Sequence, residues 1–83
     1  MAKYDPLYLY LKNNEAVVTL SFDKIEQILG FELPFSAKHY EAWWANEDVS
    51  TTTHSHCKSW QYAGYKQVGV DLKNGRVTFE RDR

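Results

Sequence analysis

The 83-residue sequence contains few of the residues that support more specialised architectures. Its single cysteine cannot form an internal disulfide, and the chain has only two prolines and four glycines, with no repeat or low-complexity segment. It has no run of about 18 apolar residues and no charged-then-apolar leader. We therefore expect one domain over residues 1–83 that stays in a reducing cytoplasm and does not enter a membrane.

Neither sign of charge predominates, because the formal net charge is −1. This value excludes a protein whose whole surface is basic. Residues 1–47 carry four Lys/Arg and seven Asp/Glu, net −3, whereas residues 48–83 carry six and four, net +2. Chance explains this asymmetry as well as a binding function does. The charge pattern alone therefore identifies no ligand.

Aromatic side chains are abundant, with three Trp, six Tyr and four Phe. A chain of this length buries only about 60% of its unfolded surface, so it needs large side chains to build a core. The motif WWAN could offer indole rings to unpaired bases if they were exposed. A small domain has more use for them inside, so we predict that at least one of Trp43 and Trp44 is buried.

Capping residues and apolar spacing predict four helices and one short strand ahead of a hairpin. Asp5 followed by Pro6 is typical of a helix start, and Ser21 and Gly30 are typical of a helix cap and stop. Gly64 is expected to end the last helix. The third helix should bury Ala37, Tyr40 and Trp44. The expected elements are a helix over 6–12, a strand over 16–22 with Val18, Leu20 and Phe22 on one face, helices over 22–29, 36–46 and 54–63, and a hairpin over 67–81.

The hairpin is the strongest local signal in the sequence. Asn74-Gly75 is the preferred pair for a two-residue type I′ turn. This turn predicts that Leu72 lies opposite Val77 and that Val70 lies opposite Phe79. Pairing with the early strand would give a three-stranded sheet, which is more stable than a lone hairpin. We therefore predict an α+β, winged-helix-like fold with four short helices, a helix-turn-helix-like pair among them, and a small antiparallel sheet.

Residues 53–59, THSHCKS, gather several chemically capable side chains. His54, His56 and Cys57 are of the types that bind zinc, but on a helix these three positions project in different directions. Cys57 stands three residues before Trp60, the spacing of a buried stripe, which favours a core cysteine over a nucleophile. Neither a carboxylate pair nor a glycine-rich phosphate loop is evident. We expect no enzymatic activity, no metal and no cofactor.

Binding to duplex DNA would explain more of these sequence features than any other function. A winged helix places the helix before the hairpin in the major groove, and its hairpin tip approaches the backbone or minor groove. Hydroxyls, imidazoles, lysines and a helix N-terminus can bind phosphate, and a glutamine can contact adenine. We expect the helix and the tip to converge on one surface. The candidate nucleic-acid-binding residues are Thr53, His54, Ser55, His56, Lys58, Ser59 and Gln61 on the helix, and Lys73, Asn74 and Arg76 at the tip.

Other interpretations stay open. Thr53 or Ser55 could simply cap the helix, and the tip residues could simply keep the hairpin soluble. The helix at 36–46 could contact DNA instead, since it offers Lys38, His39 and Asn46. A different class is a small protein-binding factor, for example a phage inhibitor of a host defence enzyme, with Trp43 or Tyr62 as an exposed hot spot. A homodimer through a spare apolar face is a third possibility.

Nearly the whole chain resembles a family of short bacterial and phage domains of unknown function. The matching stretches are KYDPLYLYL, LSFDKIEQILGFELPFSA, WWAN, SHCKSWQYAGY and VDLKNGRVTF. Members occur alone or beside restriction or nuclease modules, so the resemblance implies a link to DNA or to defence. It brings no catalytic residues with it. The sequence departs from the pattern at Tyr65, where Trp is frequent, and at Cys57, where a polar or small residue is frequent.

Overall fold

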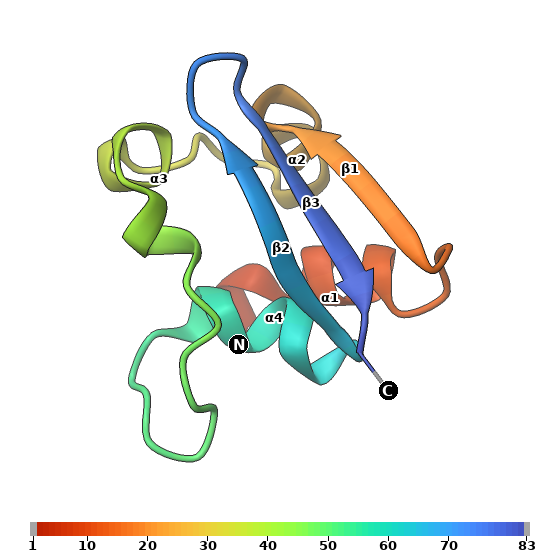
Figure 1. The fold of residues 1–83 in the computed structure, drawn as a ribbon. Coiled ribbons are helices and arrows are strands. Elements are labelled where there is room, and N and C mark those ends of the chain that lie inside the picture. Colours follow the sequence, from red (N-terminus) through yellow and green to blue (C-terminus); the bar gives the residue numbers. More distant parts are fainter. Residues whose placement is uncertain (1, 83) are drawn as a thin grey trace.

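The computed structural model describes residues 2–82, in which helices cover one face of a three-stranded antiparallel sheet (Figure 1). The strand order is β1-β3-β2, so the last strand lies in the centre. The predicted α+β class and the order of elements are confirmed. The elements are η1 (Ala2–Tyr4), α1 (Asp5–Leu11), β1 (Val17–Ser21), α2 (Phe22–Leu29), α3 (Phe35–His39), η2 (Glu41–Trp44), α4 (Ser55–Tyr62), β2 (Tyr65–Asp71) and β3 (Arg76–Arg81).

Aromatic rings fill the core between the helices and the inner face of the sheet. Trp44 stacks on Phe22 with their ring centroids 5.5 Å apart, and Trp60 lies between Trp44 at 5.8 Å and Phe79 at 5.3 Å. Trp44, Trp60 and Phe79 are completely buried. The prediction that at least one residue of the Trp43–Trp44 pair is buried is therefore confirmed.

The junction between β1 and α2 forms as its sequence predicts. The Ser21 hydroxyl accepts a hydrogen bond from the Lys24 amide at 2.9 Å, which caps α2, and Gly30 ends that helix with a φ of 83°. Gly64 likewise follows α4 with a positive φ. Phe22 is the first residue of α2 and not part of the strand, although its ring is still buried.

The helix expected over 6–12 forms one residue earlier, whereas the helix expected over 36–46 does not form as one piece. Helix α1 begins at Asp5, with Tyr4 in the cap position, and no side chain caps it. The single helix expected over 36–46 is broken at Tyr40, whose φ of −132° and ψ of 122° are extended. The break lets the Trp44 indole donate to the Ala37 carbonyl at 2.7 Å, an oxygen that a continuous helix would give to its own backbone. Tyr40, expected in the core, is 58% exposed as a result.

The predicted hairpin register is also wrong. Val70 lies opposite Val77 and Asp71 opposite Arg76, so the loop has four residues, and Leu72 lies outside the ladder. Asn74 does not adopt a positive φ, as a type I′ turn would require. Instead, the Asp71 carboxylate accepts from the Asn74 backbone at 3.1 Å and from its side-chain amide at 2.8 Å. A bulge between Gln67 and Gly69 shifts the register further along the strand.

Gly75 connects this loop to helix α2. Its φ is 64°, and its carbonyl accepts a hydrogen bond from the Phe22 amide at 2.8 Å. A Cβ atom at Gly75 would lie 3.4 Å from the Phe22 ring. The base of the hairpin loop is therefore fixed against α2 by both backbone and packing.

The side chain of Asn46, which we call the Asn46 bridge, joins the edge strand β2 to the core. Its side-chain amide donates to the backbone carbonyl of Gln67 at 2.8 Å, and its side-chain oxygen accepts from the backbone N–H of Gln67 at 2.8 Å. The same oxygen accepts from the indole nitrogen of Trp60 at 2.8 Å. Asn46 therefore takes the place of a neighbouring strand at Gln67 and satisfies a completely buried tryptophan.

Replacing Asn46 by alanine should lower the free energy of unfolding by about 1–3 kcal/mol, because the Trp60 indole loses its acceptor. Urea unfolding followed by tryptophan fluorescence measures this loss. Asn13→Ala, at an exposed asparagine after α1, is the matched control and should leave stability nearly unchanged. Equal stability of the two variants would contradict the role assigned to the bridge.

Candidate functional site

Helix α4, expected to contact DNA, is largely enclosed by the rest of the fold. Cys57, Ser59 and Trp60 are completely buried. The Ser59 hydroxyl donates to the His56 carbonyl at 2.6 Å. The prediction that Ser59 contacts nucleic acid is therefore wrong, since its side chain has no accessible surface. Ser55 and Lys58 are partly exposed.

Glu47 organises the loop before α4 and occupies two of the predicted binding residues, His54 and Gln61. Its carboxylate accepts from the Thr52 hydroxyl at 2.6 Å and lies 2.8 Å from Nδ1 of His54. These contacts lower the pKa of Glu47, with the Thr52 bond contributing most. The Gln61 amide donates to the Glu47 carbonyl at 2.8 Å, which occupies the group expected to contact adenine.

The alternative in which Thr53 or Ser55 caps α4 is wrong. His54 occupies the cap position of α4, and no side chain caps the helix. Thr53 and His54 are exposed, but the His54 ring is held against Glu47. The N-terminal end of α4 therefore has a carboxylate beside it, which disfavours a phosphate there.

The His56 side chain is packed and hydrogen-bonded within the fold. Its ring stacks on Trp43 at a centroid distance of 3.8 Å, and its Nε2 lies 2.7 Å from the Trp43 carbonyl. A carbonyl can only accept, so Nε2 carries the proton. Burial lowers the pKa of His56, which keeps the ring neutral near pH 7. Trp43 is half-buried under this stack, which leaves it less available as a protein-binding anchor than Tyr62, which is 51% exposed.

Cys57 is a core residue, as its spacing from Trp60 predicts. Its thiol donates to the His54 carbonyl at 3.3 Å and is completely buried. Burial and the nearby Glu47 carboxylate raise the pKa of the thiol, which opposes thiolate formation. Within residues 2–82, no three His, Cys, Asp or Glu residues are grouped so that they could hold a metal ion.

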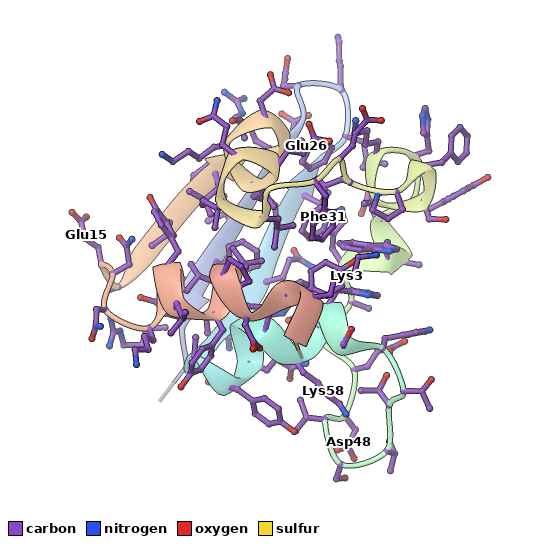
Figure 2. The ribbon with its side chains drawn as sticks, turned by 180° about the vertical axis from the view of Figure 1, so that it is seen from behind. Lys3, Glu15, Glu26, Phe31, Asp48 and Lys58 are labelled. Atoms are coloured by element: carbon purple, nitrogen blue, oxygen red, sulfur yellow. The ribbon has the colours of Figure 1, made fainter. Side chains whose placement is uncertain are left out.

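The two halves of the predicted DNA surface lie at opposite ends of the molecule. In Figure 1 the β2–β3 loop projects at the top while α4 lies at the bottom. Figure 2, seen from behind, places Lys58 at the bottom as well, near Asp48. The expected convergence of Lys58 with Arg76 is therefore wrong, because the length of strand β2 separates them.

The hairpin loop instead meets the ends of α2 and α3. These segments line an open depression of about 350 Å³. We define the hairpin-end surface as Lys38, His39, Lys73 and Asn74, all of which line this depression. The helix at 36–46, considered above as an alternative DNA contact, thus shares a surface with the tip. Arg76 is exposed nearby and pairs with Asp71 at 3.4 Å.

Beside this surface lies a group of exposed rings that sequence reasoning missed. Phe35 is 67% exposed and stacks on His39 at 4.0 Å, and Tyr40 packs edge-on against Phe35 at 6.3 Å. We call Phe35, His39 and Tyr40 the α3 aromatic cluster. The four-residue spacing between Phe35 and His39 was the available signal, since it places two rings on one helix face.

A family model described as domain of unknown function DUF7662 matches residues 4–82. The chain belongs to this family. The match includes every helix and strand from α1 to β3, and the expected membership in a family of domains of unknown function is confirmed. No curated protein and no solved structure matches the chain. No helix in residues 2–82 is long and apolar enough to cross a membrane.

The buried environment of His56 predicts a pH-dependent stability. Its folded pKa lies below the ordinary histidine value of 6.5, so the unfolded chain takes up this proton at higher pH than the folded chain. The stability that neutral His56 provides is complete above that value and is lost as the pH falls toward the folded pKa. The urea midpoint should therefore fall between about pH 7.5 and about pH 5.5.

His56→Gln should weaken this pH dependence, because glutamine keeps an N–H donor but does not titrate. His39→Gln, at an exposed histidine on α3, is the control and should leave the pH dependence as in the unaltered protein. An identical pH profile for the His56 variant would refute the assignment.

Proposed function

We propose that this domain is a non-enzymatic nucleic-acid-binding module whose ligand contacts the hairpin-end surface. The observation that carries the proposal is the meeting of α3 with the hairpin tip around one open depression. Lys38 and Lys73, which are 35 positions apart in sequence, both line it. Ammonium groups are suited to phosphate oxygens.

The positive charges at this end are partly neutralised, and the Asp23 carboxylate also lines the depression. Lys38 lies 3.0 Å from the Glu26 carboxylate, whose pKa is lowered by the Leu33 amide and by Lys38. Asp71, whose pKa is lowered mainly by Asn74, forms the pair with Arg76. Lys73 at the tip is exposed. We therefore expect few phosphate contacts and a modest salt dependence, in keeping with a net charge of −1.

Helix α4 has a structural role in this proposal. Lys58 lies at the other end of the molecule, near Asp48 (Figure 2), and His54 in the loop before α4 pairs with Glu47. Thr53 precedes His54 in that loop, and Ser55 begins α4. Apart from one extra helix between β1 and β2, the element order is that of a winged-helix domain, and the likeness to that fold is part of the proposal. A cytoplasmic location and a role in restriction or phage-host defence, implied by the resemblance described above, suit such a module.

Protein binding is the second candidate, and the exposure of Phe35 favours it. Exposed aromatic residues are frequent hot spots of protein interfaces. In this interpretation the α3 aromatic cluster, more than Trp43, would be the anchor. A homodimer through the same rings is one form of it.

Lys73→Ala should reduce the slope of log affinity against log salt by about 0.9 on duplex DNA or about 0.7 on a single strand, because one phosphate contact is lost. Fluorescence anisotropy with labelled oligonucleotides over a salt series measures this slope. Lys58→Ala is the matched control, since it removes the same charge at the opposite end.

The opposite pattern, with a reduced slope for the Lys58 variant alone, would move the binding surface to α4. Absence of binding to duplex and single-stranded DNA at the lowest salt would end the nucleic-acid proposal.

A further inference from the structure

We infer that the ligand of the hairpin-end surface is a single-stranded nucleic acid whose unpaired bases stack on Phe35 and Tyr40, an inference that rests on the proposed function. Base stacking on aromatic side chains requires rings with accessible faces and tolerates any base sequence. The α3 aromatic cluster offers such rings next to groups that suit phosphates.

The cluster is not part of the core. Phe35 and Tyr40 are more than half exposed, whereas the large rings that stabilise the fold, such as Trp44 and Trp60, are completely buried. Among the ring pairs of the described residues, Phe35 packs with His39 and Tyr40, its own neighbours on or beside α3. The extended backbone at Tyr40 directs that ring to solvent. These rings are therefore available to a ligand.

His39 links the rings to the depression. It stacks on Phe35 at 4.0 Å and also lines the depression together with Lys73 and Asn74. A strand crossing this end could place a base against Phe35 while its phosphate lies near the tip. The depression, at about 350 Å³, falls within the range of about 300–1,000 Å³ that small-ligand clefts occupy.

The scarcity of unpaired cations favours a single strand over a duplex. Duplex binding draws much of its affinity from phosphate contacts, and at this end Lys38 and Arg76 are already paired with carboxylates. Stacking supplies about 1–3 kcal/mol per base without any charge. Bases inside a duplex are stacked on each other and cannot use the rings. A protein partner would instead have to desolvate the Lys38–Glu26 pair beside the rings.

The inference is tested by anisotropy with labelled oligothymidylate of about 12 nucleotides, a length within the usual range of single-strand site sizes, and with a duplex of equal length. The single strand should bind more tightly than the duplex. Phe35→Ala and Tyr40→Ala should each weaken single-strand binding by about 5- to 150-fold, the equivalent of one lost stack. The salt slope should stay unchanged, because neither ring carries charge.

Phe35→Tyr retains an aromatic face and should bind as the unaltered protein does. Tyr62→Ala removes an exposed ring from α4, at the other end, and should have no effect. Circular dichroism of each variant checks that it is folded.

Three outcomes would overturn the inference. Equal binding of duplex and single strand, unaffected by Phe35→Ala and Tyr40→Ala but reduced by Lys73→Ala, leaves the proposed function standing without stacking. Absence of binding to both probes removes the proposed function as well. A dimer in light scattering that Phe35→Ala converts to a monomer would assign the rings to a second copy of the chain.

Discussion

The Asn46 bridge is the contact on which the arrangement of the molecule depends. One side chain pairs with the backbone of Gln67 on the edge of the sheet and holds the indole of Trp60 at the centre of the core. The loop between η2 and α4 is thereby fixed to β2, and α4 is held beneath the sheet. A helix held in this way contributes most of its surface to the interior, which explains why so many side chains of the THSHCKS segment have partners within the chain.

The two ends of the molecule differ as a consequence. At the α4 end, Glu47 gathers Thr52 and His54, while His56 covers Trp43, so polar groups bind each other and little is left for a ligand. At the hairpin end, the rings of α3 and the loop after β2 face solvent around a depression. The two ends differ in whether their side chains are bonded within the chain or face solvent, and not in net charge. This is why sequence composition alone favours neither end.

Much of the fold could be predicted because its signals are local. The Ser21 cap, the stops at Gly30 and Gly64 and the alternating β1 strand depend on neighbouring residues only. The break at Tyr40 could not be predicted, since it depends on a tertiary bond from Trp44 to Ala37. The prediction of the hairpin register failed because the bonds from Asn74 to the Asp71 carboxylate outweigh the preference of Asn-Gly for a two-residue turn. The expected convergence of α4 with the tip was wrong, although their separation could have been estimated from the sequence: β2 has seven residues, so it carries the tip roughly 23 Å away from α4.

The contact between Gly75 and Phe22 fixes the position of the hairpin loop without using the side chain at its tip. The loop is attached to α2 through a backbone carbonyl and through the space that glycine leaves empty, while Lys73 and Asn74 protrude beyond this attachment. Substitutions at position 73 can therefore accumulate without moving the loop, whereas the Asn74 side chain is itself bonded to Asp71. The chemistry at the tip of the loop is therefore uncoupled from the packing that positions the loop.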